Sequence, residues 1–287
     1  MFDTHCHLNF HSFKNNVKDV IRRANDVGVT HITIPSTDVK TSEDAIRIAD
    51  DFENTYASIG IHPHHIFKYQ IGKTEETRNS KLEIRDNFIN SELKEIENLI
   101  VNKKVVAVGE IGLDRHYYSK TKYEEYEISE KFMSLQKEVF VKQIDIAVKY
   151  KKSLVLHNRE ASDEFLEAFS NVWRDSFKQR SVFHCCEPNK KLLDFAKSHD
   201  IFIGVDGDVT YSKEKEEFVK EIPLELLVLE TDSPFLTPEP ERSIKKFPNE
   251  PKNLSFIVKF ISEKLSIPKE DLIKRTFENS IVLFNLN

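Results

Sequence analysis

The sequence is poor in glycine and in cysteine. Only seven glycines occur among 287 residues, and none falls in a G-x-G-x-x-G or G-x-x-x-x-G-K pattern, which excludes the usual glycine-rich phosphate loops. The three cysteines, Cys6, Cys185 and Cys186, are too few for a disulfide framework and lack the spacing of a zinc finger. This usage predicts a reducing compartment, the cytoplasm.

Long hydrophobic runs are also missing. No apolar run approaches the roughly 20 residues that span a bilayer, and residues 1–5 have neither the basic nor the apolar region of a signal peptide, so we expect no membrane association. With 39% hydrophobic and 31% charged residues, the composition is that of a folded globular protein. The formal net charge of −6 means that a polyanionic substrate would be attracted by metal ions and by local basic patches.

Short apolar segments alternate with amphipathic segments along the chain. The expected strands are 2–8, 31–35, 56–61, 105–109, 154–157, 182–184, 202–205 and 226–230. The expected helices are 13–27, 42–51, 132–150, 162–170, 189–198, 213–220, 253–265 and 269–284. This α/β pattern predicts a parallel sheet closed into a (β/α)₈ TIM barrel. An open doubly wound sheet would usually carry a glycine-rich loop where this sequence has His5-Cys6-His7.

We expect a single domain over residues 1–287, because no repeat or linker divides the sequence. Two stretches are longer than a compact barrel requires: residues 64–104, with a polar run at 73–86, and residues 115–131. Both follow the C-terminal ends of expected strands, where barrel enzymes place their specificity loops. The charged segments 91–98 and 213–221 are expected to be exposed helix faces.

Histidines and acids gather at the C-terminal ends of the expected strands. They are His5, His7, His62, Glu110, His157, His184 and Asp232. His5 and His7 are two apart on a strand and therefore point to one face. Imidazole and carboxylate groups bind zinc, magnesium or manganese. Four of these histidines and the two carboxylates are enough for two ions, which a bridging carboxylate would hold about 3.5–4 Å apart, as in two-metal hydrolysis.

Each of these residues also has an ordinary structural explanation. Glu110 could end a strand, Asp232 could cap a turn or a helix, and a single histidine is often only a polar surface residue. The joint pattern favours function, because all of them fall at the end of the barrel where active sites lie.

Seven motifs, in order and over nearly the whole chain, resemble the TatD family of metal-dependent deoxyribonucleases, within the amidohydrolase-like barrel superfamily. They are F-D-T-H-C-H-L at 2–8, I-G-I-H-P-H at 59–64, V-G-E-I-G-L-D at 108–114, L-H-N-R at 156–159, F-H-C at 183–185, L-E-T-D-S-P-F-L at 229–236 and P-N-E-P at 248–251. The resemblance implies a hydrolase with two divalent ions, Mg²⁺, Mn²⁺ or Zn²⁺. The implied ligands are His5, His7, Glu110, His157, His184 and Asp232.

The resemblance also implies individual roles. Glu110 would bridge the two ions, with the first two histidines and Asp232 on one side and the last two histidines on the other. Asp232 would also act as general base. His62 and Arg159 would contact a phosphate, although the first could be a turn residue before Pro63 and the second could pair with Glu160. The implied reaction is hydrolysis of DNA phosphodiester bonds, as a 3'-5' exonuclease on single-stranded DNA, with no obligate protein partner.

The sequence departs from the family pattern around the substrate. The usual H-C-F-S-G after the sixth strand is replaced by H-C-C-E-P at 184–188, which puts the charge of Glu187 near the expected phosphate site. Residues 115–123 mix basic and aromatic side chains that suit single-stranded nucleic acid or simply a solvated loop. Two alternatives stay open: a metal-dependent esterase or deacylase acting on aminoacyl-tRNA or a small ester, and a non-catalytic, metal-stabilised nucleic-acid-binding protein.

Overall fold

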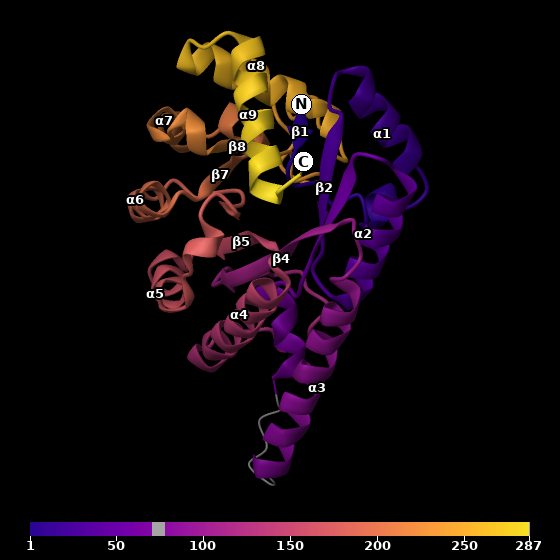
Figure 1. Cartoon of the computed structure of the whole chain (residues 1–287), viewed down its shortest axis with the longest axis vertical. Coiled ribbons are helices and arrows are strands. Elements are labelled where there is room, and N and C mark those ends of the chain that lie inside the picture. Colours follow the sequence, from indigo (N-terminus) through magenta and orange to yellow (C-terminus); the bar gives the residue numbers. More distant parts are fainter. Residues whose placement is uncertain (71–77, 287) are drawn as a thin grey trace.

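The computed structural model describes residues 1–70 and 78–286. Within these residues, eight parallel strands form one sheet in sequence order. The strands are β1 (Phe2–Asp3), β2 (His31–Pro35), β3 (Thr55–Ile59), β4 (Val105–Asp114), β5 (Ser153–Arg159), β6 (Ser181–Phe183), β7 (Phe202–Val205) and β8 (Leu227–Leu229). Helices alternate with them around the outside (Figure 1). The α-helices are α1 (Val17–Asp26), α2 (Val39–Asp51), α3 (Arg78–Leu99), α4 (Glu130–Tyr150), α5 (Ser162–Val172), α6 (Lys190–His199), α7 (Lys213–Glu221), α8 (Leu254–Leu265) and α9 (Lys269–Phe284).

The two edges of the sheet meet just beyond β1 and β8. The Thr4 amide donates to the Leu229 carbonyl at 3.1 Å, and Cys6 forms an isolated parallel bridge with Ser233. The sheet is therefore a nearly closed barrel, and the predicted (β/α)₈ TIM-barrel fold is confirmed.

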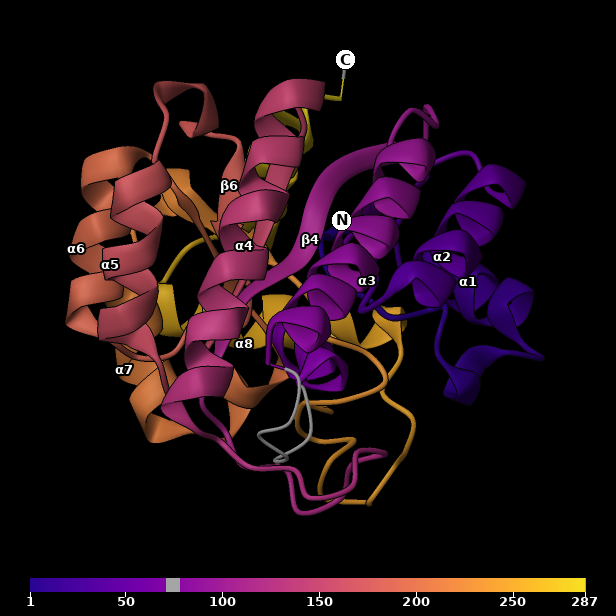
Figure 2. The same cartoon turned by 90° about the horizontal axis from the view of Figure 1, so that it is seen from below.

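Apolar side chains close the amino-terminal end of the barrel. Residues from the strands pack there against Leu283 and Phe284 of α9, and the rings of Phe2 and Phe284 lie 5.7 Å apart. The long segments that follow β4 and β8 lie on the side opposite the C-terminus of the chain (Figure 2). The carboxyl ends of the strands are therefore the end at which polar groups can gather.

Two expected strands differ from the observed ones in a way that affects the site. Residues 2–8 were expected to be one strand, but β1 ends at Asp3, and beyond it the chain pairs with the segment after β8 only locally. The expectation that Glu110 ends a strand at 105–109 is also wrong, because β4 runs on to Asp114. The pairing of β4 with β5 shifts register between Val108 and Ile111, so Glu110 lies at an irregularity inside a buried strand.

The stretch at 64–104 contains α3, a helix of 22 residues, where the sequence predicts a long insertion with a helix face only at 91–98. The missed signal is the spacing of Ile89, Leu93, Ile96 and Ile100, which are all buried and recur at helical intervals. Part of the polar run expected at 73–86, residues 73–77, lies outside the described residues. Within the described residues, no helix is both long and apolar enough to cross a membrane.

Two buried glutamines of α4 hold the carboxyl ends of β3 and β4. The Gln143 amide accepts from the Ile61 N–H at 2.7 Å and donates to the Ile61 carbonyl at 3.0 Å. The Gln136 amide makes the same pair of bonds with Asp114, at 2.8 and 2.9 Å. The two glutamines are seven residues apart and so share one helix face. They pair with backbone N–H and C=O groups that do not take part in strand pairing. These bonds fix the backbone next to His62 and the backbone four residues after Glu110.

Candidate metal centre

A cleft of about 640 Å³ opens at the carboxyl ends of the strands. Seven of the eight predicted site residues line it: His7, His62, Glu110, His157, Arg159, His184 and Asp232. The eighth, His5, is fully buried directly beneath them. The structure therefore brings together all the residues that the sequence singled out, which lie in or just beyond six strands, β1, β3, β4, β5, β6 and β8.

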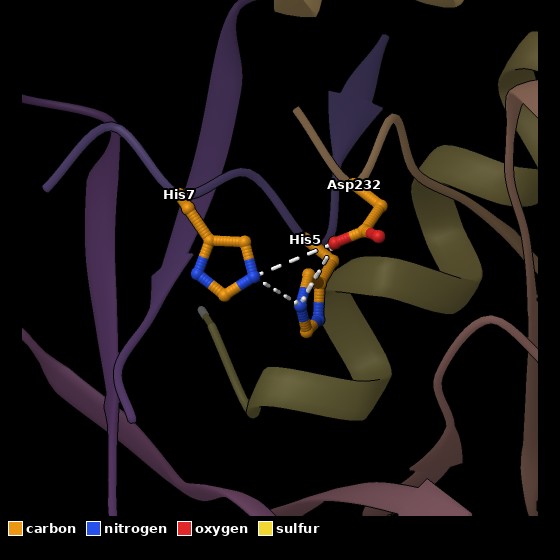
Figure 3. A group of neighbouring side chains, drawn as sticks. All are labelled: His5, His7 and Asp232. Atoms are coloured by element: carbon orange, nitrogen blue, oxygen red, sulfur yellow. Dashed lines mark hydrogen bonds and ion pairs between the residues drawn. The ribbon is translucent and has the colours of Figure 1, made fainter. Parts of the chain in front are cut away.

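His5, His7 and Asp232 converge on one point (Figure 3). The Nε2 atoms of the two histidines are 3.3 Å apart, and each lies close to Oδ1 of Asp232, at 3.6 and 3.4 Å. Three atoms with these separations are equidistant from a point about 2 Å from each, which is a typical zinc–nitrogen bond length. The donor set and its spacing therefore fit a divalent cation.

The two carboxylate oxygens of Glu110 face different sets of histidines. Oε2 lies 3.4 Å from His5 Nε2 and 3.5 Å from His7 Nε2. Oε1 lies 3.0 Å from His157 Nδ1 and 3.2 Å from His184 Nε2. A carboxylate placed in this way can contribute one oxygen to each of two cations.

The second set of donors is less compact than the first. The rings of His157 and His184 are 6.1 Å apart, and the three-residue groups that fit a cation here are His5–Glu110–His184 and His62–Glu110–His157. The predicted pair thus shares a Glu110 oxygen without forming a tight triad of its own.

His62 is better placed to donate a hydrogen bond than to bind a metal. Its Nδ1 accepts from the backbone N–H of His64 at 3.1 Å, so the neutral ring carries its proton on Nε2. That nitrogen lies 3.6 Å from Oε1 of Glu110, and the side chain lines the cleft. Burial and the neighbouring His157 hold the pKa of His62 well below its usual value, which keeps the ring neutral.

The electrostatics of the cluster also favour a cation. Burial alone would lower the pKa of His157, but hydrogen bonds to Asp114 and Glu110 raise it to about 9. Burial alone would raise the pKa of Glu110, but His184 and His5 outweigh it and lower that pKa well below its usual range. The carboxylates therefore favour protonation of the histidines. A divalent ion would compete with these protons for the same nitrogen lone pairs.

Two buried carboxylates that sequence reasoning did not single out support these histidines. Glu230 lies 3.1 Å from His184 Nδ1 and also accepts from the Cys185 amide at 2.6 Å. Asp114 lies 3.3 Å from His157 Nε2 and accepts from the Tyr118 hydroxyl at 2.7 Å. Carboxylates of this kind fix the ring orientation of metal-binding histidines. The sequence did contain a signal for both, because residues an even number apart on a strand point to the same face. Asp114 is four residues after Glu110, and Glu230 is two residues before Asp232.

Gly204 in β7 makes room for the Glu230 carboxylate. A Cβ atom at this position would lie only 2.6–2.7 Å from the carboxylate carbon and both of its oxygens. Any larger residue would therefore have to displace the group that orients His184.

Arg159 lies at the cleft rim beside an aromatic ring. Its guanidinium donates to the Tyr118 hydroxyl at 3.3 Å and lies 5.4 Å from the centre of that ring. The alternative expectation, pairing with Glu160, is not what the structure shows, because Glu160 pairs with His116 at 2.5 Å. Glu187 also lines the cleft, and it accepts from the Glu160 amide at 2.8 Å.

A further acidic group lies beside the main cluster. Cys185, Asp206 and Asp208 offer atoms within 4.8 Å of one another. The Lys215 ammonium lies among them, 3.2 Å from an Asp208 oxygen and 3.4 Å from the Cys185 carbonyl. This lysine already supplies the positive charge that a cation would otherwise bring.

The chain is similar to known metal-dependent hydrolases over its whole length. The model of the TatD related DNase family matches residues 2–285. The uncharacterized metal-dependent hydrolase YabD of Bacillus subtilis is 30% identical over 289 residues, which cover 100% of both chains. The 3'-5' ssDNA/RNA exonuclease TatD of Escherichia coli is 29% identical over 268 residues, 91% of this chain and 90% of the relative. The crystal structure of YjjV, a TatD homologue from Escherichia coli, shares the fold with a TM-score of 0.81 and 23% identity, covering 100% of this chain and 98% of that chain.

Replacing Glu230 with glutamine tests the support of His184. The Glu230→Gln variant keeps the shape of the side chain but loses the charge that orients the imidazole, so we expect divalent-metal affinity to fall roughly tenfold to hundredfold. Competition with a chromophoric chelator measures this affinity. The exposed Glu225 provides the matched Glu225→Gln control. Equal affinities for both variants and the wild type would show that Glu230 has no such role.

Proposed function

The chain belongs to the family of TatD-related DNases, and from that membership we propose that it hydrolyses phosphodiester bonds of single-stranded DNA from the 3' end. The family assignment and the relatives make it a metal-dependent hydrolase. The observation that carries the proposal of two-ion phosphodiester hydrolysis is the position of Glu110. One of its oxygens faces His5 and His7, and the other faces a second set of histidines. The relative named as a 3'-5' ssDNA/RNA exonuclease supports the choice of substrate and direction.

We assign two divalent ions, Mg²⁺, Mn²⁺ or Zn²⁺, to this site. The residues that would hold the first ion are His5, His7, Glu110 and Asp232. The residues that would hold the second are Glu110, His157 and His184. When bound, such ions supply Lewis acidity, which polarises a phosphoryl oxygen and lowers the pKa of the attacking water. The mixed imidazole and carboxylate donors suit all three metals.

We propose Asp232 as the residue that takes the proton of the attacking water. Its side chain is 14% exposed, against 0%, 4% and 5% for His5, His7 and Glu110, so it is the donor of this set most open to the cleft. Its pKa is lowered because hydrogen bonding to His7 and the nearby histidines outweigh burial. The carboxylate is therefore ionised at neutral pH and able to accept a proton.

Arg159 and His62 supply the contacts expected for a phosphate. The Arg159 guanidinium remains charged and can donate two parallel hydrogen bonds to phosphate oxygens. His62 presents its Nε2 proton to the cleft and can stabilise charge that develops on an oxygen. Both side chains line the cleft that contains Glu110.

The segments at the rim of the cleft carry local basic and aromatic side chains that suit the binding of single-stranded DNA. The segment after β4 combines Tyr117, 61% exposed, with Lys120 and Lys122. The segment after β8 carries Lys245, together with Arg242 and Lys246, which pair with Glu239 and Glu241 at 3.7 and 2.6 Å. These local cations and aromatic rings provide the attraction that the net charge of −6 does not.

Substitution of Asp232 tests the proposed proton acceptor. With Mg²⁺ or Mn²⁺, the wild type is expected to shorten a 5'-labelled single strand into a ladder of products. Asp232→Asn should lower the rate at least a hundredfold, because a general base contributes roughly 10²–10⁴. The exposed Asp200 gives the matched Asp200→Asn control, which should retain activity. No ladder with the wild type, or an undiminished ladder with Asp232→Asn, would contradict the proposal.

Substitution of Arg159 separates a phosphodiester substrate from an acyl ester. For DNA, Arg159→Ala should lower kcat/KM roughly ten- to hundredfold, since a hydrogen bond to a charged group contributes about 1.5–3 kcal/mol, and inorganic phosphate should inhibit the wild type. The control is Arg174→Ala, at an exposed position that does not line the cleft. If aminoacyl-tRNA or a small ester is cleaved faster than DNA, and neither change reduces that rate, the deacylase alternative holds instead.

A further inference from the structure

Two phenylalanines stand together at the edge of the cleft, beside the first group of metal-binding candidates. The rings of Phe10 and Phe235 are 6.2 Å apart and inclined at 74°. The Phe10 ring stacks on His7 at 4.2 Å, and the Phe235 ring lies 6.3 Å from the same imidazole. Both phenylalanines line the cleft, and no step assigned above uses either of them.

Backbone hydrogen bonds fix the main chain of both phenylalanines relative to the candidate ligands. The Phe10 N–H donates to the carbonyl of His7 at 3.1 Å, and the Phe235 N–H donates to the carbonyl of Asp232 at 2.9 Å. Each ring thus follows a candidate ligand by three residues and is tied to it by a turn. The buried Asn249 side chain also donates to the Phe235 carbonyl at 2.7 Å. The backbone that carries the aromatic pair is therefore held at a fixed position beside the candidate ligands.

Phe235 exposes a large apolar surface to the cleft. Its side chain is 48% exposed, although the neighbouring backbone is firmly held. The surroundings include His7, Asp232 and Leu236, so a ligand here must combine a flat apolar face with an anionic group that reaches the metal centre. A nucleobase attached to its phosphate has that combination, and every base offers a π face for stacking.

We propose that Phe10 and Phe235 form the stacking site for the nucleobase adjacent to the scissile phosphate. The inference rests on the proposed nuclease function and adds the part of the substrate that the metal centre does not recognise. The site is therefore expected to depend little on base identity, because stacking uses the face of the base and does not read its hydrogen-bonding edges.

Removal of the ring and removal of the base provide the test. Initial rates are measured for the wild type and Phe235→Ala on three single strands: one intact, one with a baseless tetrahydrofuran residue at the 3' end, and one with it at the penultimate position. We expect Phe235→Ala to lower kcat/KM on the intact strand roughly ten- to hundredfold, the usual loss for a base-stacking aromatic. One of the baseless strands should slow the wild type by a similar factor yet impose no further loss on Phe235→Ala.

Two controls separate stacking from general damage. Phe88 on α3 has the same 48% exposure but does not line the cleft, so Phe88→Ala should behave as the wild type on all three strands. Phe235→Trp keeps an aromatic face and should retain activity, and the metal content of every variant should stay unchanged.

The outcomes distinguish this inference from the function on which it rests. A wild type that cleaves no strand overturns the proposed nuclease function. An active wild type with an unaffected Phe235→Ala overturns the stacking site alone. The same holds if the losses from ring removal and base removal multiply, since independent effects mean that the ring and the base do not meet.

Discussion

The structure of the site depends on one buried negative charge, the carboxylate of Glu110. A carboxylate buried inside a barrel strand is costly unless cations or hydrogen-bond donors surround it. Here histidines approach both of its oxygens at 3.0–3.6 Å. Those histidines come from segments far apart in sequence, so the barrel must bring its strand ends to one place for the charge to be satisfied. The parallel topology does this, because every strand points its carboxyl end to the same face.

Around this charge, further residues orient the histidines that are candidate metal ligands. Glu230 and Asp114 hold the outer nitrogens of His184 and His157, and Gly204 leaves the space that Glu230 needs. Gln136 of α4 fixes the backbone of Asp114 in turn. A metal centre supported in this way is preorganised, so little rearrangement is required when a substrate binds. The rim differs from the centre, since its cations and aromatic rings lie mostly on segments beyond the strand ends: Phe10 after β1, Tyr117 and Lys122 after β4, and Phe235 and Lys245 after β8.

The sequence was sufficient to predict the barrel and the residues that meet in its cleft. Strand ends are visible as short apolar runs, and parallel topology makes their endpoints converge, so His5, Glu110 and Asp232 could be placed together before the structure was known. The sequence did not reveal that β4 continues through Glu110, because a register shift depends on the partner strand. It also missed Glu230 and Asp114, whose contacts are set by side-chain direction in three dimensions. The pairing of Phe10 with Phe235 was equally invisible, since it joins residues 225 positions apart.

The most direct test of this account is to locate the metals themselves. Crystals of the protein grown with Mn²⁺ and measured by anomalous diffraction should show two peaks, one on each side of Glu110, each about 2.0–2.2 Å from one of its oxygens. One peak should lie among His5, His7 and Asp232, and the other should contact His157 and His184. A single peak, or two peaks of which only one contacts Glu110, would contradict the claim that this carboxylate bridges two ions.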